Sequence, residues 1–206
     1  MNVFHEQKGS IALYTAPRAK EGATIAILIE LLRQPHCIHL VHTVKDIKRD
    51  DASAYTSLPV LFDVTSEGKK TSASGLTDIT RYLLEQYDSH HNFSYKEGSK
   101  DAQEVKNWIA FLGNTMHGEK GTAEEGFTRK ALRLYLHLEE HLQKAQSLYL
   151  AGKKCTLADL VIFPYVVAAS EANLDLERFP ELTTWHNRLL ARPGVIKGMK
   201  DVHLET

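Results

Sequence analysis

The stretch YLAGKKCTLADLVIFPYV, from Tyr149 to Val166, decides the fold of this chain. Thr156 is followed three residues later by Asp159, which predicts a capping box. In a capping box the hydroxyl accepts the Asp159 amide while the carboxylate accepts the Thr156 amide. The residues that follow, up to Ser170, are almost all apolar, as is typical of a helix surrounded by protein on all sides. We therefore expect this helix at the centre of a helical domain.

Two more helices are predicted before this stretch. Residues 104–114 place their apolar side chains on one face, and Leu134, Leu138 and Leu142 recur at intervals of four. Such amphipathic helices pair through their apolar faces. We therefore expect an all-helical bundle over residues 99–206.

The first half of the chain has a different pattern. Short apolar runs rich in β-branched residues predict strands, and longer apolar patterns predict helices. The predicted strands are 11–14, 37–44, 59–64 and 71–74, and the predicted helices are 23–32 and 76–87. This order describes a small α/β domain over 1–88, and the polar stretch 89–98 is the expected linker.

Composition excludes several classes of protein. The 206 residues are 43% hydrophobic, which is enough for a real core, and the net charge of -1 gives no basic surface for nucleic acid. Cys37 and Cys155 have neither disulfide-framework nor zinc-knuckle spacing. The first ten residues lack an apolar signal, and no apolar run reaches about 18 residues. We expect a cytoplasmic protein that binds no membrane and no nucleic acid.

Several stretches resemble the glutathione transferase superfamily. The run 149–166 looks like its signature, in which a buried helix opens with the same capping box. FSYKEGSKDAQEVKNWIAF (93–111) and FPELTTWHNRLLARPGVIKGM (179–199) are similar to fungal transferases related to the yeast nitrogen-catabolite regulator, and 13–17 and 58–61 resemble their opening strand and cis-proline strand. The resemblance implies the glutathione transferase fold: an α/β thioredoxin-like N-terminal domain plus an all-α C-terminal helical bundle.

The resemblance also implies a glutathione site in the first half. The bond before Pro59 is expected to be cis, so that the backbone of the preceding residue pairs with the cysteinyl unit of glutathione. A serine at the next helix start is expected to hold the γ-glutamyl carboxylate, because a helix N-terminus favours an anion. Ala73 stands where the family has an acidic residue. The expected glutathione-binding residues are Lys45 (or Lys48), Leu58, Pro59, Ser72 and Ser74.

The residue that activates the thiol is expected just after the first strand. A cation at Arg18 or Lys20 would lower the pKa of the glutathione thiol, because a positive charge favours the thiolate. A hydroxyl at Thr15 or Tyr14 is an alternative donor toward sulfur. Neighbouring residues on a strand face opposite sides, so at most one of these two hydroxyls can point into the site.

The family places a hydrophobic substrate between the two domains, against the first helices of the bundle. The candidates on the predicted helix and at its end are Asn107, Phe111, Thr115 and Met116, and Tyr14 is a candidate from the first strand. Met116 is expected in a glycine-containing break after that helix. The family is also expected to form homodimers.

The chain has 11 histidines, but we expect no functional metal site. His36, His39 and His42 are evenly spaced, yet a step of three on a strand alternates faces and separates them. His137 and His141 lie four apart on a predicted helix, a spacing that binds metal ions fortuitously.

Two functions are compatible with the sequence. The leading one is a glutathione S-transferase that uses the glutathione thiolate on a small hydrophobic electrophile, by conjugation or by addition and elimination, in detoxification or fungal secondary metabolism. The alternative is a non-catalytic interaction module of a translation or synthetase complex, because SASGLTDITRYL (72–83) also resembles those transferase-like domains. An enzyme should keep the residues that bind glutathione, whereas an interaction module does not need them.

Overall fold

The computed structural model describes residues 9–117, 123–145, 147–169 and 174–204. By their internal contacts the described residues divide into two compact units, those of 9–87 with 193–204 and those of 88–192. This division differs from the expected one in the last helix, which belongs with the α/β unit. Ser170, the expected end of the central helix, lies outside the described residues.

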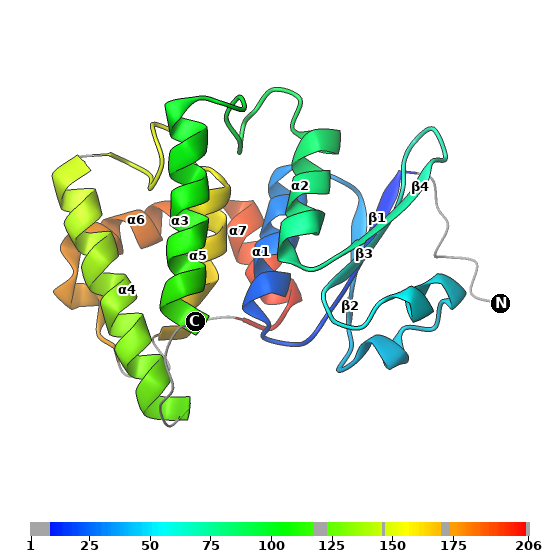
Figure 1. The fold of residues 1–206 in the computed structure, drawn as a ribbon, viewed down its shortest axis with the longest axis horizontal. Helices are drawn as coiled ribbons and strands as arrows, with labels where there is room; N and C mark the ends of the chain where they lie inside the picture. Colours follow the sequence, from blue (N-terminus) through cyan, green and yellow to red (C-terminus); the bar gives the residue numbers. More distant parts are fainter. Residues whose placement is uncertain (1–8, 118–122, 146, 170–173, 205–206) are drawn as a thin grey trace. The chain divides into compact units, whose positions relative to one another are not determined.

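The first unit contains a four-stranded mixed sheet (Figure 1). Its strands are β1 (Ser10–Thr15), β2 (His36–Leu40), β3 (Val60–Val64) and β4 (Lys70–Ser74), in the spatial order β2-β1-β3-β4. β2 runs parallel to β1, and the other neighbours are antiparallel. All four predicted strands are present, which together with the helices gives the thioredoxin-like arrangement.

The second strand is shorter than predicted. β2 ends at Leu40, and the expected strand residue Val44 instead begins a 3-10 turn, η2 (Val44–Asp46). The Asp46 carboxylate accepts the Thr43 amide at 2.8 Å and the Thr43 hydroxyl at 3.1 Å. This local capping offers the backbone hydrogen bonds that a strand would otherwise need, and it turns the chain away from the sheet.

The two faces of the sheet are covered differently. Ala12, Tyr14, Val60 and Phe62 form one cluster under the β2–β3 connection, which contains η2 and η3 (Asp50–Ala54). The alternate residues point to the other face. That face carries the helices of the unit, α1 (Lys20–Leu31), α2 (Leu76–Tyr87) and α7 (Pro193–Asp201).

Helix α7 lies directly against α1. A Cβ added to Gly198 would stand 2.5 Å from the backbone nitrogen of Ile27 and 2.6 Å from its Cα. Only glycine permits this close approach of two helix backbones. The contact explains why the end of the chain belongs to the first unit.

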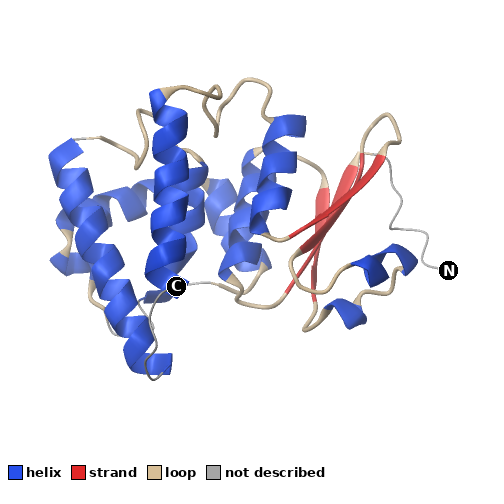
Figure 2. Ribbon diagram, viewed as in Figure 1, coloured by secondary structure: helices blue, strands red, loops and turns tan. Residues whose placement is uncertain are grey.

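The second unit is entirely helical in its described part (Figure 2). Its helices are α3 (Lys100–His117), α4 (Ala123–Ala145), α5 (Leu157–Ala169) and α6 (Pro180–Leu190), with a short 3-10 turn η5 (Leu176–Arg178). The predicted glycine-containing break at Met116 is wrong, because α3 continues to His117. No helix among the described residues combines the length and the apolar character that crossing a membrane requires.

The predicted capping box is the hydrogen-bonding centre of this unit. The Asp159 carboxylate accepts the Thr156 amide at 2.8 Å, and the Thr156 hydroxyl also donates to it at 3.2 Å. Its other oxygen accepts the Leu150 amide at 3.0 Å and the Trp185 indole N–H at 2.9 Å. Burial raises the pKa of Asp159, although all four donors oppose that shift. The half of the predicted box in which the carboxylate accepts the Thr156 amide is therefore confirmed, and the Thr156 hydroxyl donates to the same carboxylate.

The expected linker is ordered and packs within the second unit. The buried carboxylate of Asp88 accepts the Asn92 amide at 2.6 Å, the Phe93 amide at 3.0 Å and the Ser94 hydroxyl at 2.9 Å. The Phe93 carbonyl then accepts the Leu157 amide at 3.0 Å. The segment therefore supports the start of α5.

Candidate functional site

The candidate site lies where β1 ends, at the strand ends on one side of the sheet, here called the candidate edge. In the antiparallel registers Tyr14 pairs with Val60, and Val60 pairs with Ser74. The end of β1, the start of β3 and the end of β4 therefore meet at one edge. β2 ends there too, since the Val41 amide donates to the Thr15 carbonyl at 3.0 Å. This edge collects loops from three separate parts of the sequence.

The segment before β3 has the predicted conformation. The Leu58–Pro59 peptide bond is cis, as expected. The Pro59 carbonyl accepts the Gly75 amide at 2.9 Å, so this segment is tied to the end of β4. β3 begins at Val60, which leaves the Leu58 backbone outside the ladder between the strands. An extended peptide could pair with that backbone.

The two predicted serines differ in what their hydroxyls do. The Ser72 hydroxyl accepts a hydrogen bond from the Tyr55 hydroxyl at 2.7 Å, and this bond links the β2–β3 connection to β4. The Ser74 hydroxyl has no hydrogen-bond partner among the residues that the structure describes. Ser74 lies just before Gly75, whose φ of 76° suits glycine, and α2 begins at the next residue. Ser74 is thus the better placed of the two to bind a ligand at a helix N-terminus.

The loop between β1 and α1 carries the two predicted cations. Arg18 is exposed and has a φ of 60°, a left-handed conformation that few residues other than glycine adopt. The Val202 carbonyl, just after α7, accepts the Arg18 amide at 2.7 Å. Lys20 is half-buried and is the first residue of α1. Arg18 thus lies in the loop that follows the end of β1, and Lys20 lies where this loop enters α1.

Neither predicted hydroxyl of β1 is open to a ligand. Thr15 is fully buried, and a Cβ added to Gly22 would lie 2.0 Å from its oxygen, so Thr15 faces α1. Tyr14 is 5% exposed and stacks on His39 with ring centroids 4.6 Å apart. Burial also raises the pKa of the Tyr14 phenol. The expectation that the two face opposite sides is confirmed, but both sides are covered.

The β2–β3 connection contains a cation that sequence reasoning missed. Lys45 is exposed in η2, whereas Arg49 lies inward, with its guanidinium 4.2 Å from the Phe62 ring centroid. Arg49 also donates to both oxygens of Asp51 at 3.0 Å, and these hydrogen bonds lower the pKa of that carboxyl. Arg49, Lys45 and Lys48 have the same charge and lie in one polar segment, so sequence alone does not separate their roles.

Neither cysteine has the environment of a reactive thiol. Cys37 is half-buried on β2 with its sulfur 3.3 Å from His39 Nε2, and burial raises the pKa of its thiol. Cys155 is buried beside the capping box, and burial raises the pKa of its thiol as well. A low thiol pKa is the usual mark of a reactive cysteine. The thiol of any reaction at this site is therefore best supplied by a ligand.

The predicted substrate residues of the second half all lie on α3. Asn107 is exposed, Thr115 is buried, and Met116 is half-buried with its carbonyl accepting Lys130 Nζ at 2.9 Å. Phe111 packs between α3 and α4, 4.2 Å from the His137 ring and 5.7 Å from the Trp108 ring by their centroids. Phe111 therefore has a packing role within the unit, and the substrate role of these residues stays a prediction.

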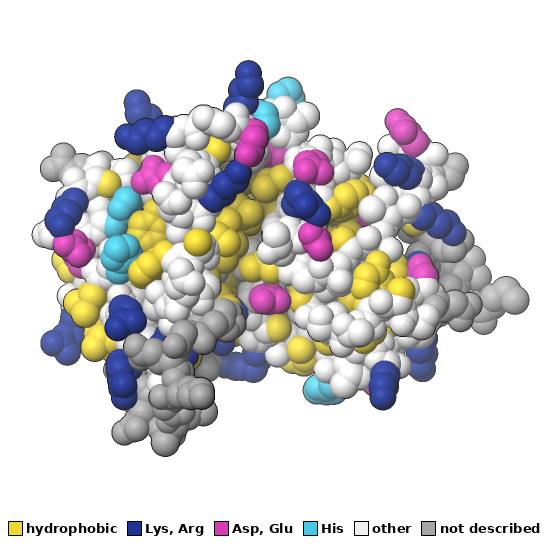
Figure 3. Space-filling model, in the orientation of Figure 1, with side chains coloured by type: hydrophobic (Ala, Val, Ile, Leu, Met, Phe, Trp, Pro, Cys, Tyr) yellow, Lys and Arg dark blue, Asp and Glu magenta, His cyan; other side chains and the backbone are white. Residues whose placement is uncertain are grey.

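The second unit also has a partly apolar outer surface. Hydrophobic side chains gather beside histidines over α3 and α4 (Figure 3). Two shallow hollows of about 410 and 360 Å³ lie along α4. Their described lining residues include His137 and Glu140 in both and none of the predicted substrate residues.

Comparisons with known proteins agree with this architecture. Residues 100–198 match the family model described as the C-terminal domain of glutathione S-transferase. The chain is 28% identical to the glutathione S-transferase-like protein tpcF of Aspergillus fumigatus over 88% of this chain and 92% of that protein. It is 24% identical to the glutathione S-transferase-like protein gedE of Aspergillus terreus over 86% of this chain and 89% of that protein.

Solved structures show the same fold over nearly the whole chain. A glutathione transferase homologue from Lodderomyces elongisporus, solved with two glutathione molecules per subunit, has a TM-score of 0.75 at 25% identity and covers 93% of this chain and 98% of its own. The transferase URE2P8 of Phanerochaete chrysosporium, solved with oxidised glutathione, has a TM-score of 0.76 at 21% identity over 96% of each chain. Since the fold, the family match over residues 100–198 and the fungal relatives agree, this chain has the glutathione transferase fold, and its second half matches the C-terminal domain of that family.

Proposed function

We propose that this chain is a glutathione transferase that directs the glutathione thiolate at a small hydrophobic electrophile. The observation that carries the proposal is the edge of the sheet where the Leu58–Pro59 segment, Ser74 and the loop after β1 meet. The Lodderomyces homologue, which shares the fold, was solved with glutathione. Glutathione has a peptide backbone, two carboxylates and a thiol, and this edge offers a partner for each kind of group.

Glutathione binds along the start of β3 in this proposal. The Leu58 backbone pairs with the cysteinyl unit, because that backbone is not used by the neighbouring strands. The Ser74 hydroxyl and the first amides of α2 hold the γ-glutamyl carboxylate, since hydrogen bonds to an ionised group are strong and a helix N-terminus favours an anion. Lys45 reaches the second carboxylate from the β2–β3 connection.

Arg18 or Lys20 activates the thiol. A cation beside the sulfur lowers the thiol pKa by favouring the thiolate. The thiolate then forms a bond to an electrophilic carbon, and the electron pair leaves with a leaving group or remains on the adduct. In an isomerisation the same thiolate is later eliminated and the double bond re-forms. The choice between these outcomes depends on the substrate.

Ala73 favours a second candidate function. The family's acidic residue at this position faces the ligand's amino group, and alanine has no carboxylate to do so. A transferase-like interaction module of a translation or synthetase complex would not need that contact. Such a module would keep the fold without binding glutathione.

Calorimetric titration with reduced glutathione separates the two functions. The variant Ser74→Ala should weaken binding by about 10-fold or more, since a hydrogen bond to a charged group contributes about 1.5–3 kcal/mol. The matched control is Ser66→Ala, which removes an exposed serine from the turn between β3 and β4. Saturable binding that only Ser74→Ala weakens supports the transferase. If the wild-type chain binds no glutathione at millimolar concentration, the interaction module is the better proposal.

We further propose a cytoplasmic homodimer that acts in detoxification or secondary metabolism. The family resemblance supports each of these statements, and the net charge of -1 fits a small-molecule substrate better than a nucleic acid. Light scattering after size-exclusion chromatography tests the dimer, because a single peak of monomer mass at micromolar concentration would contradict it.

A further inference from the structure

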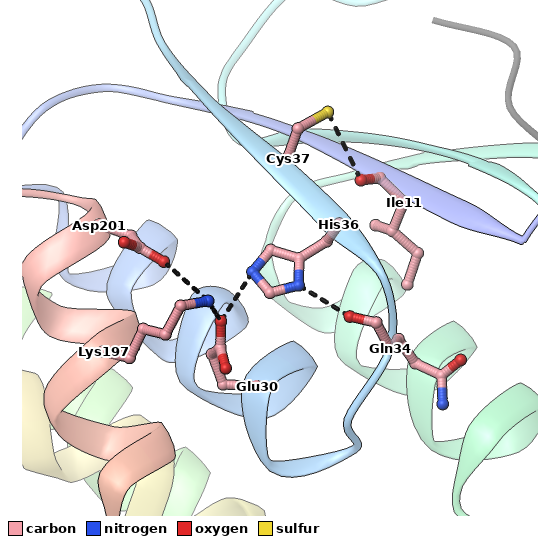
Figure 4. A network of polar contacts seen from close by, with 7 residues as sticks. All are labelled: Ile11, Glu30, Gln34, His36, Cys37, Lys197 and Asp201. Carbon is pink, nitrogen blue, oxygen red and sulfur yellow. Dashed lines mark hydrogen bonds and ion pairs between the residues drawn. The ribbon is translucent and has the colours of Figure 1, made fainter. Parts of the chain in front are cut away.

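A cluster of metal-binding side chains lies at the opposite edge of the first unit, where β2 begins (Figure 4). Glu30 comes from the end of α1, His36 from the start of β2 and Asp201 from the end of α7. One ligand atom from each residue lies within 4.8 Å of the others, and His36 Nε2 is 2.9 Å from Glu30 Oε1. Glu30 and His36 lie close together in the sequence, and Asp201 joins them from the C-terminal helix, so one imidazole and two carboxylates come together.

A cation already occupies the space between the carboxylates. The Lys197 ammonium forms an ion pair with Glu30 and lies 3.7 Å from Asp201 Oδ2. The Lys197 side chain is 57% exposed, whereas those of Glu30 and His36 are only 14% and 9% exposed. The acceptors are therefore held by the fold, while the lysine reaches them from solvent and can leave without disturbing them.

The hydrogen bond of His36 Nδ1 leaves Nε2 as the nitrogen that can bind a cation. Nδ1 is 2.8 Å from the Gln34 carbonyl oxygen, which can only accept, so Nδ1 carries the hydrogen. In neutral imidazole Nε2 is then a bare acceptor, and it faces the Glu30 carboxylate. These two atoms, 2.9 Å apart, form a pair of acceptors that a metal ion could bind. A backbone carbonyl on the second ring nitrogen is also how metal-binding histidines are usually oriented.

We propose that Glu30, His36 and Asp201 bind one divalent transition metal ion of the Zn²⁺ class, with Lys197 taking its place when the metal is absent. Imidazole nitrogen and carboxylate oxygen are both zinc ligands, and water would complete the four-coordinate shell. On binding, the Lys197 ammonium moves into solvent and any proton on His36 Nε2 is released. The metal then joins α7 to α1 and β2 and stabilises the docking of the C-terminal helix.

Calorimetric titration of the 206-residue chain with ZnCl2 tests the site. Lys197→Ala removes the competing ammonium, and we expect one zinc equivalent to bind about 10-fold more tightly than in the wild type, since a cation next to a metal ion repels it. Adding His36→Ala or Asp201→Asn to that variant should weaken this equivalent by about 10- to 100-fold. The control is His42→Ala, which removes an exposed histidine from the same unit.

A second measurement keeps the result independent of folding. Asp201 is at the end of α7 with its side chain 30% exposed, so Asp201→Asn should keep the far-ultraviolet circular dichroism of the parent. Co²⁺ added in place of Zn²⁺ should give the visible absorption of a tetrahedral nitrogen–oxygen site in Lys197→Ala and lose it in both double variants. The proposal fails if Lys197→Ala binds zinc no better than the wild type, or if His42→Ala weakens the tight equivalent as much as Asp201→Asn does.

Discussion

Replacing Asp159 by alanine should strongly destabilise the second unit. This carboxylate accepts four hydrogen bonds, from the amides of Thr156 and Leu150, the Thr156 hydroxyl and the Trp185 indole. The residue is fully buried, so water cannot replace it as acceptor in the variant. Its loss would disconnect the start of α5 from α6 and from the segment before α5.

The magnitude follows from the donors that are left behind. Three N–H groups would be buried without a partner, and each costs about 1–3 kcal/mol, whereas the Thr156 hydroxyl can rotate to another acceptor. Removing a carboxylate that burial disfavours, as its raised pKa indicates, offsets part of this cost. We expect a net loss of about 3–5 kcal/mol, the usual result of removing one partner from a buried charged network.

Urea unfolding monitored by tryptophan fluorescence measures this loss. The chain has two tryptophans, Trp108 and Trp185, and both lie in the second unit, so the midpoint reports on that unit. The matched control is Asp175→Ala, because Asp175 also caps a helical turn but is exposed and accepts a single amide at 3.0 Å. It should cost about 1 kcal/mol. A loss from Asp159→Ala no larger than that of the control would refute the reasoning.

Three further outcomes are expected. Gly198→Ala should lower the thermal midpoint of the first unit, because the added Cβ would meet the backbone of α1, at a cost of about 1–3 kcal/mol. The control Gly113→Ala places its Cβ in open space on α3 and should be neutral or stabilising. Burial lowers the pKa of His186 below its usual 6.5, so the neutral side chain stabilises the fold above pH 6.5 and this stabilisation is lost as the pH falls below it. His186→Leu should therefore reduce the loss of unfolding free energy at low pH, measured by urea unfolding at a series of pH values. Arg18 and Arg33 have left-handed backbones, with φ of 60° and 55°, so Arg18→Gly and Arg33→Gly should each raise the stability by up to about 1 kcal/mol. Only Arg18→Gly should also raise the thiol pKa of bound glutathione, which is measured by the absorbance of the thiolate as a function of pH.

The sequence predicted best where local pattern and tertiary packing agree. The capping box at Thr156 and Asp159 needs only residues three apart, and the apolar run after it is buried in the structure as expected. The strand 59–64 and its hairpin partner 71–74 likewise have apolar or turn signals within a few residues. The boundary of β2 was wrong because the Thr43–Asp46 capping is itself local and competes with the strand pattern.

Roles that depend on tertiary placement could not be predicted in this way. Alternation on a strand correctly separated Tyr14 from Thr15, but it gives no information about what covers each face. α1 covers Thr15, and the β2–β3 connection covers Tyr14. Asn107 and Phe111 share a helix, yet one is exposed and the other is fixed by a ring of α4. What covers a residue is thus decided by other elements of the fold, α1 for Thr15, the β2–β3 connection for Tyr14 and α4 for Phe111.

Helix α7 shows how far apart those elements can be. Its amphipathic sequence is typical of a helix in a bundle, yet its glycine at position 198 lets it pack against α1, so that it belongs to the first unit. From there the Val202 carbonyl holds the Arg18 amide, in the loop where we expect the thiol to be activated. Arg18, with its left-handed conformation, is thus held by a residue from the other end of the sequence. Since Lys197 and Asp201 belong to the same helix, a metal ion bound there would stabilise the helix that is followed directly by Val202, the partner of Arg18.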